Sequence, residues 1–106
     1  MNMRRHLPWP FEGDRFPDDL GAVVQRTVLG GELPARVVGH GSDGSWYVGD
    51  GVNDPNEPGA TVATHMRHVL ERNSSVATLA TLPPGHRAVR DRPGDSWRVE
   101  PMDLED

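Results

Sequence analysis

Apolar and polar residues alternate along several short stretches of the chain, and a repeat of two residues is typical of half-buried β-strands. Ala22 and Val24 show this spacing, and so do Trp46 and Val48. The turn-forming residues 41–44 predict a four-residue loop that pairs the strands on either side of it in an antiparallel manner. The expected strands in the first half of the chain are residues 21–28, 35–40 and 45–49.

In the middle of the chain the apolar spacing lengthens to three and four residues, which indicates helices. Thr64 is available as the N-cap of a first helix, and Ser74 or Ser75 can cap a second. A pair of prolines then ends the second helix. The two expected helices are residues 64–72 and 74–82.

The last part of the folded region has the pattern of a hairpin. Its turn contains Pro93 and Gly94, and the alignment of its two strands places Val89 opposite Trp97. A further short strand is expected just before the first helix. These three stretches are residues 86–90, 96–100 and 60–62.

The order of elements is strands, two short helices and a closing hairpin, without regular alternation of strands and helices. This order predicts an α+β fold: a single small domain with a mostly antiparallel sheet of about five strands and two short helices before a C-terminal hairpin. The aromatics of the first segment are expected to lie against the domain, and the last segment is expected to be mobile. The segments are an irregular N-terminal arm rich in proline and aromatics (residues 1–20, with Trp9, Phe11 and Phe16), the domain (residues 21–100) and an acidic tail (residues 101–106).

Composition narrows the chemistry that the chain can perform. It has 106 residues and no cysteine, which excludes disulfides, thiolate nucleophiles and cysteine-based zinc sites. Its 11 basic residues are all arginine and stand against 16 acidic residues, and the net charge of -5 disfavours nucleic acid as a partner. No stretch has the roughly 20 apolar residues of a membrane-spanning helix, and no signal peptide is recognised, so we expect a soluble, cytoplasmic protein.

Two patterns are typical of enzymes, and both are incomplete. Residues 39–44, with the sequence GHGSDG, match the dinucleotide fingerprint, but the chain continues as a strand where the fingerprint requires a helix. His65 and His68 lie three residues apart on the first expected helix and could bind one metal ion. A third ligand would have to come from elsewhere in the fold: His40, Asp43 or His86.

The segment of residues 50–59 is expected to be a surface loop, because glycine, asparagine and proline dominate it. Asp50, Asp54 and Glu57 supply it with three carboxylates. Such a loop can attract a basic partner, hold calcium through carboxylate oxygens, or serve as an ordinary polar connection. Tyr47 faces away from the expected core and is the aromatic best placed to contact a partner nearby.

Three segments carry a resemblance to a known group of small bacterial proteins: residues 43–50 (DGSWYVGD), 70–76 (LERNSSV) and 79–88 (LATLPPGHRA). Over roughly residues 21–100 the chain resembles the proteins catalogued as domain of unknown function 2185, also called immunity protein family 33. The resemblance implies a small non-enzymatic protein that neutralises a toxin delivered between bacteria. The family defines no catalytic residues, so none are implied for this chain.

Three hypotheses follow from these observations. The first is a non-enzymatic, immunity-type domain that binds a protein partner such as a toxin and needs no cofactor or metal. The second is a metal-dependent enzyme that uses His65 and His68. The third is a structural or regulatory domain with no dedicated site. Under the first hypothesis, the expected partner-binding residues are Tyr47, Asp50, Asp54 and Glu57.

Overall fold

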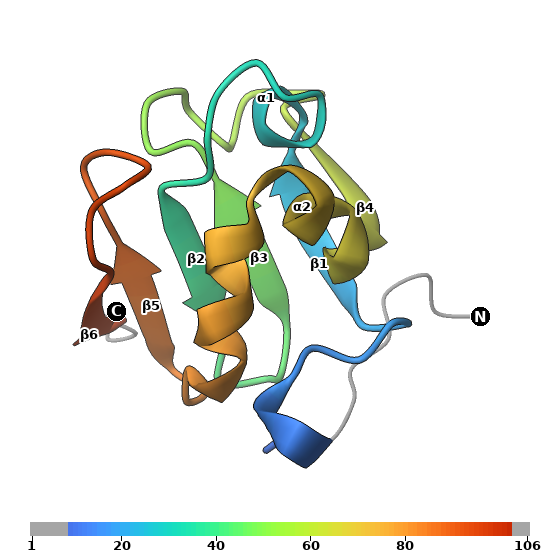
Figure 1. Ribbon diagram of the computed structural model, residues 1–106. Coiled ribbons are helices and arrows are strands. Elements are labelled where there is room, and N and C mark those ends of the chain that lie inside the picture. Colours follow the sequence, from blue (N-terminus) through green and yellow to red (C-terminus); the bar gives the residue numbers. More distant parts are fainter. Residues whose placement is uncertain (1–8, 103–106) are drawn as a thin grey trace.

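The computed structural model describes residues 9–102, and its centre is a six-stranded β-sheet (Figure 1). The strands lie in the order β4-β1-β3-β2-β5-β6 across the sheet. All neighbouring strands pair antiparallel except β1 and β3, which run parallel. In chain order the elements are η1 (Glu12–Asp14), β1 (Gly21–Gln25), α1 (Arg26–Leu29), β2 (Val37–His40), β3 (Trp46–Gly49), β4 (Thr61–His65), α2 (Met66–Arg72), η2 (Ser74–Thr81), β5 (His86–Val89) and β6 (Arg98–Pro101).

This architecture confirms the α+β fold and the mostly antiparallel sheet that the sequence predicts. It has six strands where about five were expected, because the short strand expected over residues 60–62 is a full edge strand, β4. All five residues of β1 pair with β4, from Gly21 opposite His65 to Gln25 opposite Thr61. This pairing draws Thr64 and His65 into the sheet. Helix α2 therefore begins at Met66, and Thr64 is not its N-cap.

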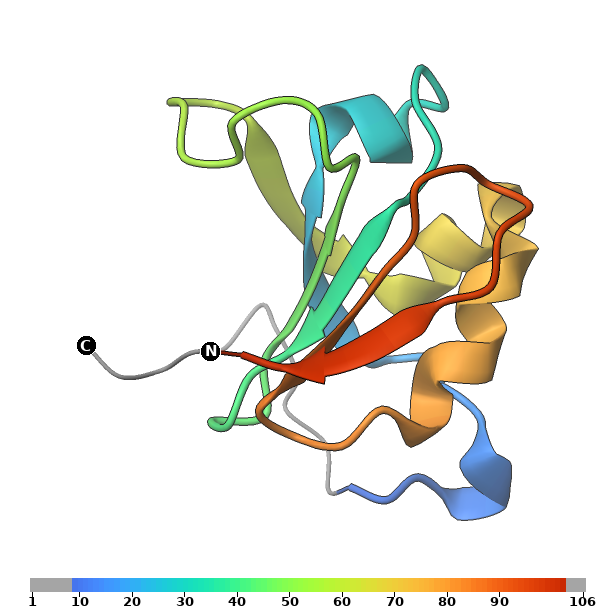
Figure 2. The same ribbon diagram turned by 90° about the vertical axis from the view of Figure 1, so that its left-hand side faces the viewer.

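The helices lie on one face of the sheet. Figure 1 shows α2 and η2 in front of the strands, and the perpendicular view in Figure 2 shows both helices on one side only. The first described segment of the chain lies at one end of the same face, below the helices in Figure 1. We call the opposite side of the sheet, which no helix of the described residues covers, the open face.

The face beneath the helices carries the hydrophobic core. Val24, Val38 and Val48 project into it from three adjacent strands and are fully buried, whereas Val23 and Val37 point to the open face. The strand alternation in the sequence therefore marks the two faces correctly. The other buried apolar residues are Phe11, Leu20, Ala22, Val28, Ala35, Trp46, Met66, Val69, Val76, Leu79, Ala80, Leu82 and Ala88.

The described part of the N-terminal arm, residues 9–20, packs its aromatics against the domain, as expected. The ring of Phe11, which is 5% exposed, lies 5.9 Å from the ring of Trp46. Trp9 donates its Nε1–H to the carbonyl of Ala80 at 3.1 Å. Between residues 9 and 20 the short turn η1 is the only helix or strand. Residues 1–8 of the arm and residues 103–106 of the acidic tail lie outside the described residues.

Two expected elements differ in kind from the structure. The strand expected over residues 21–28 ends at Gln25, and α1 follows it directly. The spacing of four residues between Val24 and Val28 suits a helix as well as a strand, which explains the error. The second expected helix forms, but as the 3-10 helix η2.

The closing hairpin forms in a different register from the expected one. Val89 pairs with Arg98 and not with Trp97, so the alignment is shifted by one residue. Trp97 lies just before β6, where its ring packs 4.0 Å from the guanidinium of Arg90 and its Nε1–H donates to the carbonyl of Ser75 at 3.4 Å. It is half-buried at the margin of the core. Strand β6 continues to Pro101, the first residue of the expected tail.

Candidate functional site

Asp50 begins the loop of residues 50–59 but is fully buried beneath it. Its carboxylate accepts hydrogen bonds from the hydroxyl of Thr27 at 2.5 Å, from the Val52 N–H at 2.8 Å, and from the Asn53 N–H and Nδ2–H at 2.8 and 2.9 Å. Gln25 completes the network, because its Oε1 accepts the Asp50 N–H at 2.7 Å and its Nε2–H donates to the Asn53 carbonyl at 3.2 Å. Asp50, one of the expected partner-binding residues, therefore lies beneath the surface that a partner would contact. Its carboxylate is a fixed anchor inside the loop.

The charge of Asp50 is stabilised by these hydrogen bonds. Burial raises the pKa of its carboxyl, but the hydrogen bonds from Thr27, Asn53 and Val52 outweigh burial and lower the pKa to about 2. The carboxylate is therefore ionised at neutral pH, with hydrogen-bond donors around both oxygens.

The remainder of the loop is folded into turns by its own polar groups. Oδ1 of Asp54 accepts the N–H of Asn56 at 2.9 Å, which closes a local side-chain turn. The N–H of Ala60 donates to the carbonyl of Glu57 at 3.0 Å. The end of the loop thus returns to β4 along a defined path.

The outer surface of the loop combines an apolar side chain with carboxylates. Val52 is 63% exposed and is one of the two large apolar residues of the described chain that are strongly exposed. Asp54 and Glu57 are exposed along the same loop. Figure 2 shows the loop projecting away from the body of the domain, on the side opposite the helices.

Tyr47 lies on the open face, as expected, close to the base of the loop. A Cβ atom at Gly49 would overlap the Oη and Cζ atoms of Tyr47, so the phenol lies directly over this glycine. The side chain of Gln25, part of the anchoring network, also lies beside Gly49. Burial, followed by the charge of Asp50, raises the pKa of Tyr47 to about 12, which keeps the phenol protonated at neutral pH.

The structure brings together only some of the expected partner-binding residues. Asp54 and Glu57 line one hollow of about 300 Å³ on the loop. Tyr47 lines a different hollow on the open face, and Asp50 is buried between the two regions. Val52 was not among the expected residues. The signal that could have identified it is an isolated valine within a run of polar and turn-forming residues.

The histidines of the metal hypothesis come close to each other without a third ligand. The rings of His65 and His68 are 6.0 Å apart, at the junction of β4 and α2. His40 is buried elsewhere, where it stacks 3.9 Å from the ring of Trp46 and donates from Nδ1 to the carbonyl of Leu82 at 2.7 Å. Between residues 9 and 102, no three His, Asp or Glu side chains are close enough to hold a metal ion.

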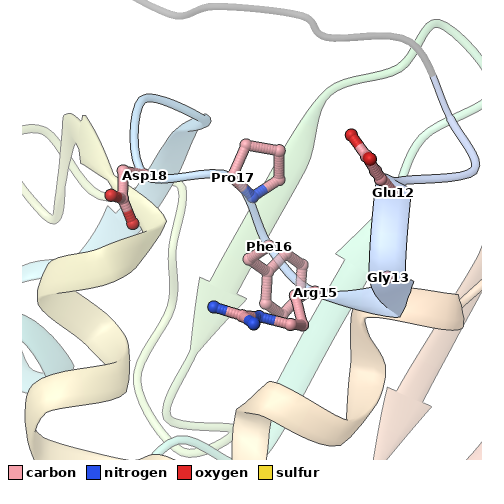
Figure 3. Close-up of a pocket in the computed structure, with 6 residues that line it drawn as sticks. All are labelled: Glu12, Gly13, Arg15, Phe16, Pro17 and Asp18. Atoms are coloured by element: carbon pink, nitrogen blue, oxygen red, sulfur yellow. The ribbon is translucent and has the colours of Figure 1, made fainter.

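A further hollow of about 490 Å³ lies on the N-terminal arm, around Phe16 and Pro17. Figure 3 shows that its charged side chains, Glu12, Arg15 and Asp18, point in different directions and do not converge on one point. This arrangement holds no set of groups that could act together on a ligand.

No family model, no curated protein and no solved structure matches the chain. Within the described residues no helix is both long and apolar enough to cross a membrane.

Proposed function

We propose that the protein is a non-enzymatic domain that binds a protein partner through the loop of residues 50–59. The observation that carries the proposal is the contrast between the buried anchor of this loop and its exposed outer surface. Asp50 and Gln25 fix the loop from within, while Val52, Asp54 and Glu57 face outward. A loop that is already ordered loses little conformational entropy when it binds.

The chemistry of the loop indicates the kind of partner surface that it would fit. An exposed valine can enter a small apolar depression and exclude water there, as the central contacts of interfaces do. Asp54 and Glu57 beside it favour a partner with a basic rim, which also accelerates association. The net charge of -5 acts in the same direction. A basic protein with an apolar depression is therefore the preferred partner.

The proposal takes the partner to be a toxin neutralised in the cytoplasm. This part depends on the resemblance of residues 43–50, 70–76 and 79–88 to immunity protein family 33. The loop fits such a role, because a rigid acidic projection can cover a basic active or binding surface of a toxin.

The test is affinity co-purification of the tagged protein from its own source cells, with mass spectrometry of what remains bound after a salt wash. A variant that combines Val52→Ser, Asp54→Ala and Glu57→Ala should lose the bound protein, and its Kd for the purified partner should rise at least about 10-fold. The matched control removes the same three kinds of group elsewhere. It combines Val99→Ser, Asp18→Ala and Glu71→Ala, all at exposed positions.

The control variant should retain the partner with unchanged Kd. Equal loss of binding in both variants would indicate a general effect of charge, and full retention by the loop variant would remove the loop from the proposal. Absence of any stoichiometric partner under conditions in which the toxin gene is expressed would contradict protein binding itself.

A further inference from the structure

The open face of the sheet carries a groove formed by two adjoining hollows. One is about 530 Å³, and Arg36, Arg90 and Arg98 line it together with Val37 and Val89. The other is about 340 Å³ and is lined mainly by apolar groups. Val37 borders both hollows, so they form one continuous surface, which we call the open-face groove.

Arginines line the first hollow, although the whole chain has a net charge of -5. Its two carboxylates are Asp91 and Glu100. Glu100 accepts a hydrogen bond from Nε of Arg87 at 2.7 Å, and Asp91 lies 4.0 Å from Arg98. Among residues 9–102, no carboxylate accepts a hydrogen bond from the two remaining guanidinium groups, those of Arg36 and Arg90.

The guanidinium of Arg90 is engaged by contacts inside the protein. Its Nε–H and Nη2–H both donate to the carbonyl of Ala35, at 3.2 and 3.1 Å, and its guanidinium stacks on Trp97. Arg90 is 5% exposed, and Trp97 in turn donates to the carbonyl of Ser75 in η2, so the guanidinium of Arg90 lies on the helix side of the sheet and not in the hollow. Burial lowers the pKa of Arg90, and the charge of Asp95 offsets this only in part. The guanidinium of Arg90 serves the packing of the hairpin and is not part of the site proposed below.

The side chain of Arg36, unlike that of Arg90, has a buried nitrogen without a partner. Its Nε is buried and has no hydrogen-bond partner, and it is the sole side-chain nitrogen or oxygen between residues 9 and 102 of which this is true. A buried donor without an acceptor costs free energy, and the cost is larger for a charged group. A ligand that turned the end of this side chain toward the hollow would give Nε an acceptor and remove this cost.

The position of Arg36 is also fixed before any ligand binds. Its N–H donates to the carbonyl of Gly49 at 2.9 Å, and its own carbonyl accepts the N–H of Arg90 at 3.0 Å. Gly51 packs against its stem, since a Cβ there would come within 3.3 Å of the Arg36 Cβ. A guanidinium on a fixed backbone and a packed stem is well suited to bind an oxyanion through two parallel hydrogen bonds.

The second hollow fits an apolar group attached to that oxyanion. Val37, Tyr47 and Met102 provide its apolar walls, and Gly39 leaves room between them, with the sulfur of Met102 3.7 Å from where a Cβ would lie. Small-ligand sites typically combine such an apolar surface with a few charged groups that set the orientation.

We propose that the open-face groove binds a small organic anion, with its carboxylate or phosphate at Arg36 and Arg98 and its apolar part over Val37 and Tyr47. The site borders the loop of residues 50–59 at Gly51, but it uses none of the exposed residues Val52, Asp54 and Glu57 and does not depend on the function proposed above. A carboxylate and a phosphate share the chemistry that these arginines recognise, and the experiment distinguishes them.

The experiment is an NMR titration of the isotope-labelled full chain with four probes: phenyl phosphate, phenylacetate, inorganic phosphate and benzyl alcohol. One or both aromatic anions should give saturable shifts at the backbone amides of Arg36, Val37 and Gly39. Their Kd should be at least about 10-fold lower than that of inorganic phosphate, because the apolar hollow contributes, and benzyl alcohol should not saturate. The stronger of the two aromatic anions identifies the preferred head group.

Variants test the arginines directly. Arg36→Gln should raise the Kd about 10-fold or more, and so should Arg98→Gln, whose side chain is 61% exposed and can change without disturbing the core. Arg67→Gln on α2 removes the same charge from the other side of the sheet and should leave the Kd unchanged. Absence of saturable shifts with both aromatic anions would overturn the proposal. So would equal Kd values for all three variants, or equal affinity for inorganic phosphate and phenyl phosphate.

Discussion

Asp50 shows how the burial of one residue can be misjudged from sequence alone. An aspartate at the start of a polar loop is normally a surface group, yet here it is fully buried and accepts four hydrogen bonds. The donors come from α1 and from the loop itself. A carboxylate with so many fixed donors stabilises the fold only in its ionised form, so its contribution depends on pH.

We expect this dependence at acidic pH. The carboxyl has a pKa of about 2 in the folded protein and an ordinary value of 3.8 when unfolded. Because the folded value is the lower one, the stabilisation is complete above about pH 5 and is lost as the pH falls toward 2, in total about 2 kcal/mol. Urea denaturation of the wild type and of Asp50→Asn as a function of pH measures it.

The Asp50→Asn protein should be about 2 kcal/mol less stable at neutral pH, because an amide offers one acceptor oxygen where the network needs two. The difference between the two proteins should shrink as the pH approaches 2. Asp54→Asn is the control, since Asp54 is exposed and an amide oxygen can still accept the Asn56 N–H. An unchanged difference at all pH values would show that the charge of Asp50 does not stabilise the fold.

At the level of elements, the sequence predicts what depends on local alternation. The two strands around the turn of residues 41–44 and the helix that contains Met66, Val69 and Leu70 form where their spacing indicates. The incorrect predictions concern elements whose structure depends on partners distant in sequence. Thr64 belongs to a strand because β1, about 40 residues earlier, pairs with it.

The loop anchor could not be predicted for the same reason. Gln25 and Asp50 are 25 residues apart. They meet because β1 and β3 pair in parallel, with Val24 opposite Val48, so that both strands end at the same edge of the sheet. No local pattern specifies that pairing. The residues of the loop were therefore identified from sequence, but the division between buried anchor and exposed surface was not.

The side chain of Arg90 holds the closing hairpin against the rest of the sheet, and this contact leads to a prediction. Arg90 joins the end of β5 to the segment before β2 through Ala35 and covers Trp97 before β6. A lysine at this position keeps the charge but cannot make the paired hydrogen bonds or stack its planar group on the indole. Arg90→Lys should lower the free energy of unfolding by about 2 kcal/mol.

Amide hydrogen exchange provides the second measurement. In the Arg90→Lys protein the amides of β5 and β6 should exchange faster, while those of β1 and β4 change less, because the lost contacts hold only one side of the sheet. Arg92→Lys is the matched control, since that side chain is 80% exposed in the same turn. Equal stabilities of the two variants would mean that Arg90 contributes only its charge.

For the whole molecule, residues 9–20 of the N-terminal arm complete the core. Helices α2 and η2 have 7 and 8 residues, and a six-stranded sheet extends beyond what they cover. The arm packs against the remaining part, where Trp46 and His40 lie side by side. A small domain has little apolar surface to spare, so this contribution is a substantial share of its stability.

The arm therefore belongs to the cooperative unit, and Phe11 tests this. Phe11→Ala should lower the free energy of unfolding by about 3 to 4 kcal/mol, because it removes a ring that is 5% exposed and in contact with Phe16 and Trp46. Val52→Ala, at a position that is 63% exposed, should change it by less than about 0.5 kcal/mol. Both values come from chemical denaturation followed by circular dichroism. If Phe11→Ala were as mild as Val52→Ala, the domain would fold independently from residue 21 onward, and the arm would only rest on its surface.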